Sequence, residues 1–231
     1  GCSTWKILAN PVNNPLSMLS DRSSNQAGEV CITGVGLLTP VGIGREQTWQ
    51  SYLDSKSGVA RIRGWDATDE AVKLAGQVPE EFEDRFHDEI QLPFARRFGR
   101  FTQFALFAGQ EAIQHSGLDL QDIDLTRVGV AIGVGGGATH YLDPIRDAML
   151  AGDPVDFARS IDHYFVIKTM FNAPAGMLSI QNGFQGPSAM VSAACASGCA
   201  AVSTGLDWIR SGRADVVLVG GTDSTVNRET I

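Results

Sequence analysis

Cys195 is the residue of this sequence whose type and surroundings best suit covalent chemistry. It lies in SAACASG, residues 192–198, where an apolar segment gives way to a helix-like one. Its neighbours are small, so a substrate can reach the sulfur. The free N–H groups and partial positive charge at a helix N-terminus stabilise a thiolate, and they can also hold an oxyanion. Cys195 is therefore a candidate nucleophile. Its position alone is also compatible with a small core residue that takes no part in chemistry.

The other cysteines carry less information. Cys199 lies one helical turn after Cys195 and Cys31 lies in an apolar segment, so we expect both to be core residues. Cys2 lies in a polar N-terminal stretch and indicates nothing. The four cysteines form neither a CxxC pair nor a short disulfide framework, which favours a reducing compartment.

A glycine cluster, GVGGG at residues 133–137, is the second candidate feature. It lacks the Lys-Ser/Thr pair of a phosphate-binding P-loop, and its match to GxGxxG is loose. We therefore expect a close backbone approach or a pocket wall at this cluster. His140 follows it and is a candidate to line the same pocket.

Strand-like and helix-like segments alternate along the chain, which predicts an α/β domain with a largely parallel sheet. We expect the last two strands to be central, because their apolar runs do not alternate with polar residues. Residues 1–29 are expected to form a loose extension and residues 58–92 a surface insertion. The predicted strands are 30–42, 127–137, 187–194 and 214–221, and the main helices are 45–56, 98–116 and 195–212.

Composition excludes several functional classes. The chain has 231 residues, 43% of them hydrophobic, with a formal net charge of -8. Such an acidic chain is a poor nucleic-acid binder, because phosphate contacts need a basic face. No apolar run approaches the roughly 18 residues of a membrane span. We expect a cytoplasmic protein, or a plastid one if the source is eukaryotic.

Six ordered motifs over about residues 30–224 resemble the N-terminal half of a β-ketoacyl-ACP synthase, the elongating ketosynthase of the thiolase superfamily. The motifs are ITGVGLLTPVG, RRFGRFTQFAL, GVGGG, NAPAGMLSIQNGFQGPS, SAACASG and GRADVVLVGGTDS. The resemblance implies a thiolase-like fold, of which residues 30–231 form one βαβαβ half of a five-layered αβαβα architecture. The C-terminal half is expected to be absent from this chain.

The same resemblance implies an acyltransferase activity. An acyl group would move from acyl-carrier-protein phosphopantetheine to Cys195. The backbone N–H of Cys195 would also donate one hydrogen bond to the oxyanion. Decarboxylative Claisen condensation with malonyl-ACP would then extend a fatty-acid or polyketide chain. No bound cofactor or metal is implied. The implied partners are acyl carrier protein and a second subunit, in a homodimer or a ketosynthase-like heterodimer.

Four further positions match family positions with a role. Gly136 replaces an aliphatic residue that narrows the acyl tunnel in many relatives, which implies a deeper or differently shaped pocket. Phe165 matches a position that reaches toward the partner subunit's pocket, with plain core as the alternative. Arg96 and Arg97 match positions that meet the acidic carrier protein, with a solvated helix end as the alternative.

The family's two catalytic histidines and a supporting lysine would lie beyond Ile231. The four histidines present, His87, His115, His140 and His163, fall at none of those positions. The chain alone is thus expected to be acylated but not to condense. It is expected to be either a fragment of a longer enzyme or one of two complementary chains. A thiolase or acyl-CoA-primed synthase, and a non-catalytic partner like a chain-length factor, stay as alternatives; RRFGRFTQF disfavours the former and Cys195 the latter. The acyl group and pathway stay open.

Overall fold

The computed structural model describes residues 3–9, 29–90, 92, 95–137, 141, 143–152, 161 and 163–227. The strands are β1 (Ser3–Ala9), β2 (Cys31–Thr39), β3 (Gly42–Ile43), β4 (Val59–Arg61), β5 (Leu74–Gly76), β6 (Val128–Gly133), β7 (Ser188–Val191) and β8 (Val216–Gly221). The α-helices are α1 (Arg45–Leu53), α2 (Phe82–Glu89), α3 (Arg100–Ser116), α4 (Asp143–Ala151), α6 (Phe165–Thr169), α7 (Ala173–Asn182) and α8 (Ser197–Arg210), with the short 3-10 helices η1 (Ala95–Arg97) and η2 (Leu125–Arg127).

The main sheet has the strand order β3-β2-β1-β8-β6-β7. Strands β8, β6 and β7 are parallel, and β2 runs in the same direction because both β2 and β8 pair antiparallel with β1. The largely parallel α/β sheet predicted from the sequence is confirmed. Strand β8 is central as expected, but β7 lies at the end of the described sheet and was wrongly expected to be central.

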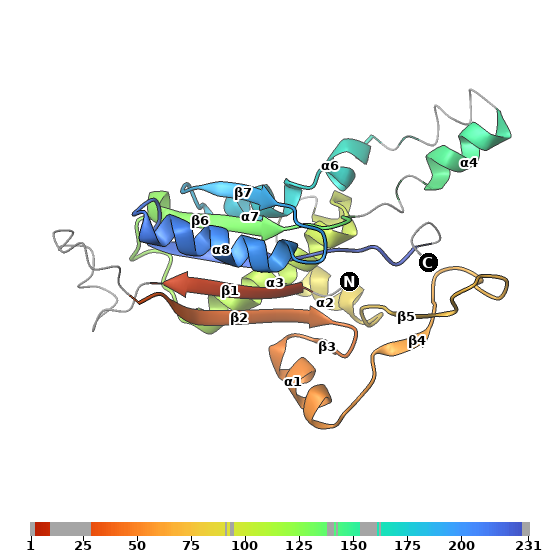
Figure 1. The fold of residues 1–231 in the computed structure, drawn as a ribbon, viewed down its shortest axis with the longest axis horizontal. Coiled ribbons are helices and arrows are strands. Elements are labelled where there is room, and N and C mark those ends of the chain that lie inside the picture. The colour runs from red at the N-terminus through yellow and green to blue at the C-terminus, as the bar shows by residue number, and fades with distance from the viewer. Residues whose placement is uncertain are drawn as a thin grey trace.

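The expectation of a loose extension over residues 1–29 is wrong for Ser3–Ala9. These residues form β1, which lies between β2 and β8 and pairs with both. Figure 1 shows β1 beside β2. Its backbone groups complete the ladders of two strands that would otherwise present open edges to each other. A short segment can become a strand in this way without a strong hydrophobic pattern of its own. Residues 10–28 lie outside the described residues.

Helices cover both faces of the sheet, with α8 on one face and α3 and α7 on the other (Figure 1). Every residue of β6 is buried, as a strand covered on both faces requires. Alternate side chains serve the two layers: Val130 and Ile132 pack with α3 and α7, while Ala131 packs with α8. The sheet therefore holds the ends of β6, β7 and β8 in one rigid row.

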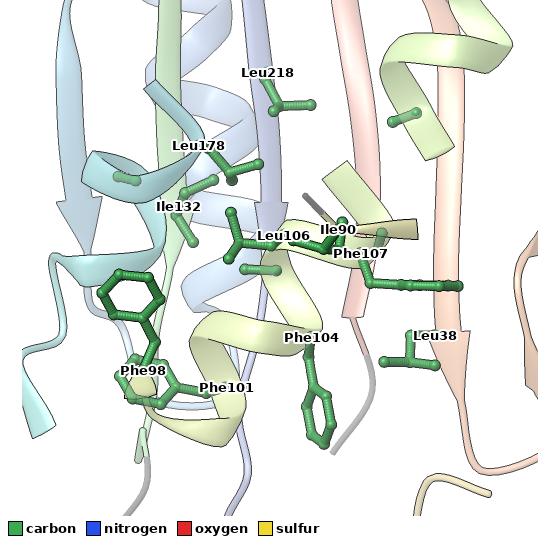
Figure 2. Close-up of a cluster of buried hydrophobic side chains, with 14 of the residues drawn as sticks. Leu38, Ile90, Phe98, Phe101, Phe104, Leu106, Phe107, Ile132, Leu178 and Leu218 are labelled. Atoms are coloured by element: carbon green, nitrogen blue, oxygen red, sulfur yellow. The ribbon is translucent and has the colours of Figure 1, made fainter. Parts of the chain in front are cut away.

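Helix α3 contributes Phe101, Phe104 and Phe107 to the larger core, shown in Figure 2. Its Phe104 and Phe107 rings lie 5.4 Å from the ring of Phe82 in edge-to-face geometry. Phe82 and Phe86 of α2 are 0% and 1% exposed. The expectation of a surface insertion over residues 58–92 is therefore wrong for α2, because its two phenylalanines, four residues apart on one helix face, are core residues.

Candidate active site around Cys195

Cys195 lies in a tight turn between β7, which ends at Val191, and α8, which begins at Ser197. Residues 192–196 are all exposed, including the Cys195 thiol. The expected join between a strand and a helix is thus present, although the strand is shorter and the helix starts two residues later than expected. The turn brings the sulfur to the N-terminal end of α8 and leaves it open to solvent.

Ser197 holds this turn together from within. Its hydroxyl accepts a hydrogen bond from the N–H of Ala193 at 2.8 Å and donates one to the carbonyl of Ala194 at 2.6 Å. Ala194 has a φ of 49°, in the left-handed region that costs a residue with a Cβ roughly 1 kcal/mol or more. The strained residue immediately precedes Cys195, so the Ser197 bonds fix the direction in which the thiol projects.

Glycines form the floor beneath the turn. A Cβ on Gly133 would lie 2.3 Å from the carbonyl carbon and oxygen of Ser197, and one on Gly135 would lie 2.9 Å from the carbonyl oxygen of Ala194. Gly221, at the end of β8, faces Gly198 in the same way, at 3.1 Å from its Cα. The ends of β6 and β8 thus lack side chains where the turn packs against them. This close approach was the role expected for the glycine cluster.

Asp223 occupies the backbone N–H groups of the same cluster. Its Oδ1 accepts hydrogen bonds from Gly136 and Gly137, both at 2.7 Å, and its carboxylate also contacts the N–H of Gly135 at 3.2 Å. Converging N–H groups of this kind bind anions, and here the anion is the protein's own carboxylate. The phosphate-loop interpretation of GVGGG therefore fails, because those N–H groups are already used.

The Cα of Gly136 faces the side chain of Thr225. A Cβ on Gly136 would lie 2.7 Å from the Cγ2 of Thr225, so the threonine methyl group already fills the direction that an aliphatic side chain would take. A differently shaped acyl pocket at Gly136 stays a prediction. Sequence reasoning missed both Asp223 and Thr225, although both follow β8 in GGTDST, where parallel-strand ends converge.

Comparison with known proteins places this chain in a family. The family described as "Beta-ketoacyl synthase, N-terminal domain" matches residues 27–231. The chain belongs to the β-ketoacyl synthase family. It is 33% identical over 194 residues to 3-oxoacyl-(acyl-carrier-protein) synthase 2 of Vibrio harveyi, covering 84% of this chain and 45% of that protein. It is 31% identical over 207 residues to the same-named protein of Staphylococcus aureus, covering 90% and 48%. The chain thus spans about half the length of these relatives.

Solved structures agree on the fold. The ishigamide ketosynthase/chain length factor superposes with a TM-score of 0.74 at 26% identity, covering 85% of this chain and 47% of that one. A type II PKS acyl-carrier protein in complex with its ketosynthase superposes with a TM-score of 0.67 at 18% identity, covering 97% and 52%. The predicted thiolase-like ketosynthase fold is confirmed. Strand β1 lies before the residues that match the family.

Arg97 of this β-ketoacyl synthase chain contacts the residue that directly precedes Phe165. The Arg97 guanidinium hydrogen-bonds the Tyr164 hydroxyl and lies 4.6 Å from the centre of its ring, and Tyr164 directly precedes Phe165 at the start of α6. Phe165 is half-buried, while Val166 and Ile167 beside it are exposed. The side chain of Arg96 lies outside the described part of the structure.

Arg100, the third arginine of RRFGR, turns inward. It pairs with Glu83 and lies over the rings of Phe82 and Phe104, at 5.0 and 5.1 Å. Burial lowers the pKa of Arg100 from its ordinary value, and the nearby Tyr141 acts in the opposite direction. Of the arginines in this motif, Arg97 is exposed and Arg100 ties α3 to α2.

The described histidines lie on elements other than the cysteine turn, so none of them is assigned as a base for Cys195. His115 hydrogen-bonds the backbone of Val35, and His163 is exposed just before α6; His140 lies outside the described residues. The described part of the chain also contains no cluster able to hold a metal ion and no helix long and apolar enough to cross a membrane. Cys31 and Cys199 are exposed here, so the expectation that both are core residues is wrong.

A cavity of about 680 Å³ is lined by residues of the loops that follow β4 and β5, by the first turns of α3 and by residues after β8. Trp65, Arg100 and Asn227 line it, and Cys195 does not. The described residues therefore place Cys195 on an open face of the half-domain and not in a closed pocket. A pocket at Cys195 needs a further surface laid over residues 192–196.

Proposed function

We propose that the full-length protein is a β-ketoacyl-ACP synthase in which Cys195 carries the acyl chain. The Cys195 thiolate attacks the thioester carbonyl of an acyl group held on acyl-carrier-protein phosphopantetheine. The phosphopantetheine thiolate leaves, and the acyl group stays on Cys195. The observation that carries this proposal is the exposed thiol in the strained turn before α8, in a chain of this family.

The second step would be condensation. Malonyl-ACP loses CO₂, the resulting carbanion attacks the acyl-Cys195 carbonyl, and the Cys195 thiolate departs. The product is a β-ketoacyl-ACP two carbons longer. The backbone N–H of Cys195, in the turn just before α8, would stabilise the oxyanion of both tetrahedral intermediates. The histidines and lysine that the family uses would come from the sequence after residue 231.

A second subunit would supply part of the missing cover. Strand β7 pairs with β6 on one side only within the described sheet, and the residues that follow it are exposed. An edge strand of this kind can pair with its twin across a two-fold axis. We propose that β7 does so, which would lay a second copy, or a ketosynthase-like partner chain, beside Cys195. The apolar α6 residues next to Phe165 would face the same partner.

Labelling tests the nucleophile. Full-length protein incubated with radiolabelled acyl-ACP should form a thioester that maps to Cys195. Cys195→Ala should abolish the label, whereas Cys199→Ala, the matched change one turn later, should keep it. Label that survives Cys195→Ala would overturn the proposal. Acyl-CoA in place of acyl-ACP separates the acyl-CoA-primed alternative, and absence of label with both donors would favour the non-catalytic partner.

Carrier-protein docking has its own test. Arg97→Glu should slow acylation of Cys195 by acyl-ACP, because the exposed cation of Arg97 would no longer attract the acidic carrier. Acylation by a small acyl-pantetheine thioester should not change. Arg210→Glu, an equal charge change at the exposed far end of α8, is the control. Equal slowing by both variants, or slowing with both donors, would rule out specific docking at Arg97.

A further inference from the structure

Asp223 is the anion that the glycine cluster binds, and its setting differs from that of an ordinary surface carboxylate. It lies two residues after β8 and is half-buried. It accepts hydrogen bonds from the N–H groups of three successive glycines, Gly135, Gly136 and Gly137. Hydrogen bonds to a charged acceptor are about twice as strong as neutral ones. The carboxylate therefore fixes the conformation of a loop that has no side chains to fix it.

The rest of the segment strengthens this clamp. Gly137 has a φ of 63°, in the left-handed region that glycine adopts without strain, so the chain can turn immediately after the N–H that Asp223 accepts. The next residue after the aspartate, Ser224, donates its N–H to the Gly137 carbonyl at 2.8 Å. The segment after β8 thus binds both backbone groups of Gly137: Asp223 accepts its N–H, and Ser224 donates to its carbonyl.

The clamped loop is also the surface on which the cysteine turn rests. Gly135 approaches the Ala194 carbonyl so closely that a Cβ would lie 2.9 Å from that oxygen and 3.3 Å from Asp223 Oδ2. The same Ala194 carbonyl accepts hydrogen bonds from the hydroxyl of Ser197 at 2.6 Å and from its N–H at 3.1 Å. Ala194 is therefore held between two partners while its backbone is strained, and Cys195 is the next residue.

We propose that Asp223 is a positioning residue for Cys195, acting through the backbone of Gly135 and Ala194. It touches neither the sulfur nor, in this scheme, the substrate. Without the carboxylate the three glycine N–H groups lose their common acceptor, the loop gains freedom, and Ala194 can relax from its left-handed conformation. The thiol and the Cys195 N–H then lose their shared alignment on the thioester carbonyl. This inference rests on the proposed role of Cys195 as nucleophile.

Asp215 provides a matched control, because it lies just before β8 as Asp223 lies just after it. It pairs with Arg127 through two hydrogen bonds, of 2.7 and 3.1 Å, at the opposite end of the strand. Removing either carboxylate breaks charged hydrogen bonds next to the same strand. Only Asp223 borders the glycine loop and the cysteine turn.

The test compares two reactions of Cys195 in full-length protein, for wild type, Asp223→Ala, Asp223→Asn and Asp215→Asn. Acylation by acyl-ACP needs the thiol and the oxyanion donor aligned, whereas alkylation by iodoacetamide needs only an accessible thiol. A misplacement of about 1 Å can cost on the order of 10²-fold in rate. We expect Asp223→Ala to slow acylation about ten-fold or more and to change alkylation less than about two-fold. Asp223→Asn keeps an acceptor oxygen and should lie between; it also serves if the alanine variant does not fold.

Two results would overturn the proposal. One is acylation by the Asp223 variants at the rate of Asp215→Asn. The other is a parallel fall of acylation and alkylation, which indicates general loss of structure. Hydrogen exchange over residues 192–198 should rise in Asp223→Ala and not in Asp215→Asn, and it requires no acyl transfer. If wild type is not acylated, the proposed function fails, while this exchange difference still decides the coupling of Asp223 to the turn.

Discussion

The Cγ2 of Thr225 lies 2.7 Å from the point where a Cβ on Gly136 would be. The two residues come from the ends of different strands and share one small volume. Gly136→Leu alone should therefore destabilise the protein by about 1–3 kcal/mol, because the new side chain overpacks against Thr225. Gly136→Leu combined with Thr225→Gly should recover much of that loss, measured as the unfolding midpoint in denaturant.

The double variant and the single change Thr225→Gly together test the predicted acyl pocket. If the space at Gly136 belongs to the tunnel, the double variant should shift the acyl-ACP preference of the full-length protein toward shorter chains. The single change Thr225→Gly, measured alongside, should shift it toward longer ones. An unchanged chain-length profile in both variants would place the Gly136–Thr225 contact outside the acyl pocket.

Gly133 and Gly176 give a contrasting prediction for two glycine-to-alanine changes. A Cβ on Gly133 would meet the Ser197 backbone at 2.3 Å, whereas one on Gly176 of α7 would meet nothing within 4 Å. Gly133→Ala should cost about 1–3 kcal/mol or more, since backbone cannot move aside as a side chain can. Gly176→Ala should stabilise by roughly 0.5–1 kcal/mol, as alanine does in a helix interior. Thermal melts of both variants check this; equal effects would contradict the close packing of β6 against the cysteine turn.

The sequence was informative where a local pattern coincides with a tertiary role. Small residues around Cys195 between an apolar strand and a helix predicted the exposed turn, and the GVGGG run predicted a close backbone approach. The apolar run of β8 predicted a central strand, because such a run leaves no face for water. Each of these features depends on neighbours in the chain.

Features that join distant segments were not predictable from one sequence. Asp223 and the glycine loop are 86–88 residues apart, and only the parallel pairing of β6 with β8 brings them together. The Phe82 and Phe86 pair was hidden in a polar stretch whose average composition indicated surface. Strand β1 precedes an Asn-, Ser- and Pro-rich stretch, and its pairing partners β2 and β8 supply the ladder that its own sequence does not announce.

Phe86 tests whether α2 belongs to the core. It is 1% exposed and packs beside Phe82 at 5.5 Å between ring centres. Phe86→Ala should cost about 3–5 kcal/mol of unfolding free energy, since it leaves a cavity in the aromatic cluster. Leu150→Ala on α4, where the leucine is 79% exposed, should change it by less than about 0.5 kcal/mol. Denaturant unfolding of the two variants gives the comparison, and a Phe86→Ala cost as small as that of Leu150→Ala would return α2 to the surface.

Lys6 lies at the middle of β1, where its backbone pairs with Val35 of β2 and Val219 of β8. Lys6→Pro removes the backbone N–H and fixes φ near −65°, so an interior strand cannot accept it. The variant loses one hydrogen bond of the sheet and leaves the carbonyl that accepted it without a donor, which should lower the free energy of unfolding by about 1–3 kcal/mol. Hydrogen exchange should rise in β2 and β8 together, because β1 covers an edge of each. Lys6→Thr keeps the N–H and should leave exchange unchanged. If Lys6→Pro also leaves both strands protected, some other segment must pair with β2 and β8, and residues Ser3–Ala9 do not complete the sheet in solution.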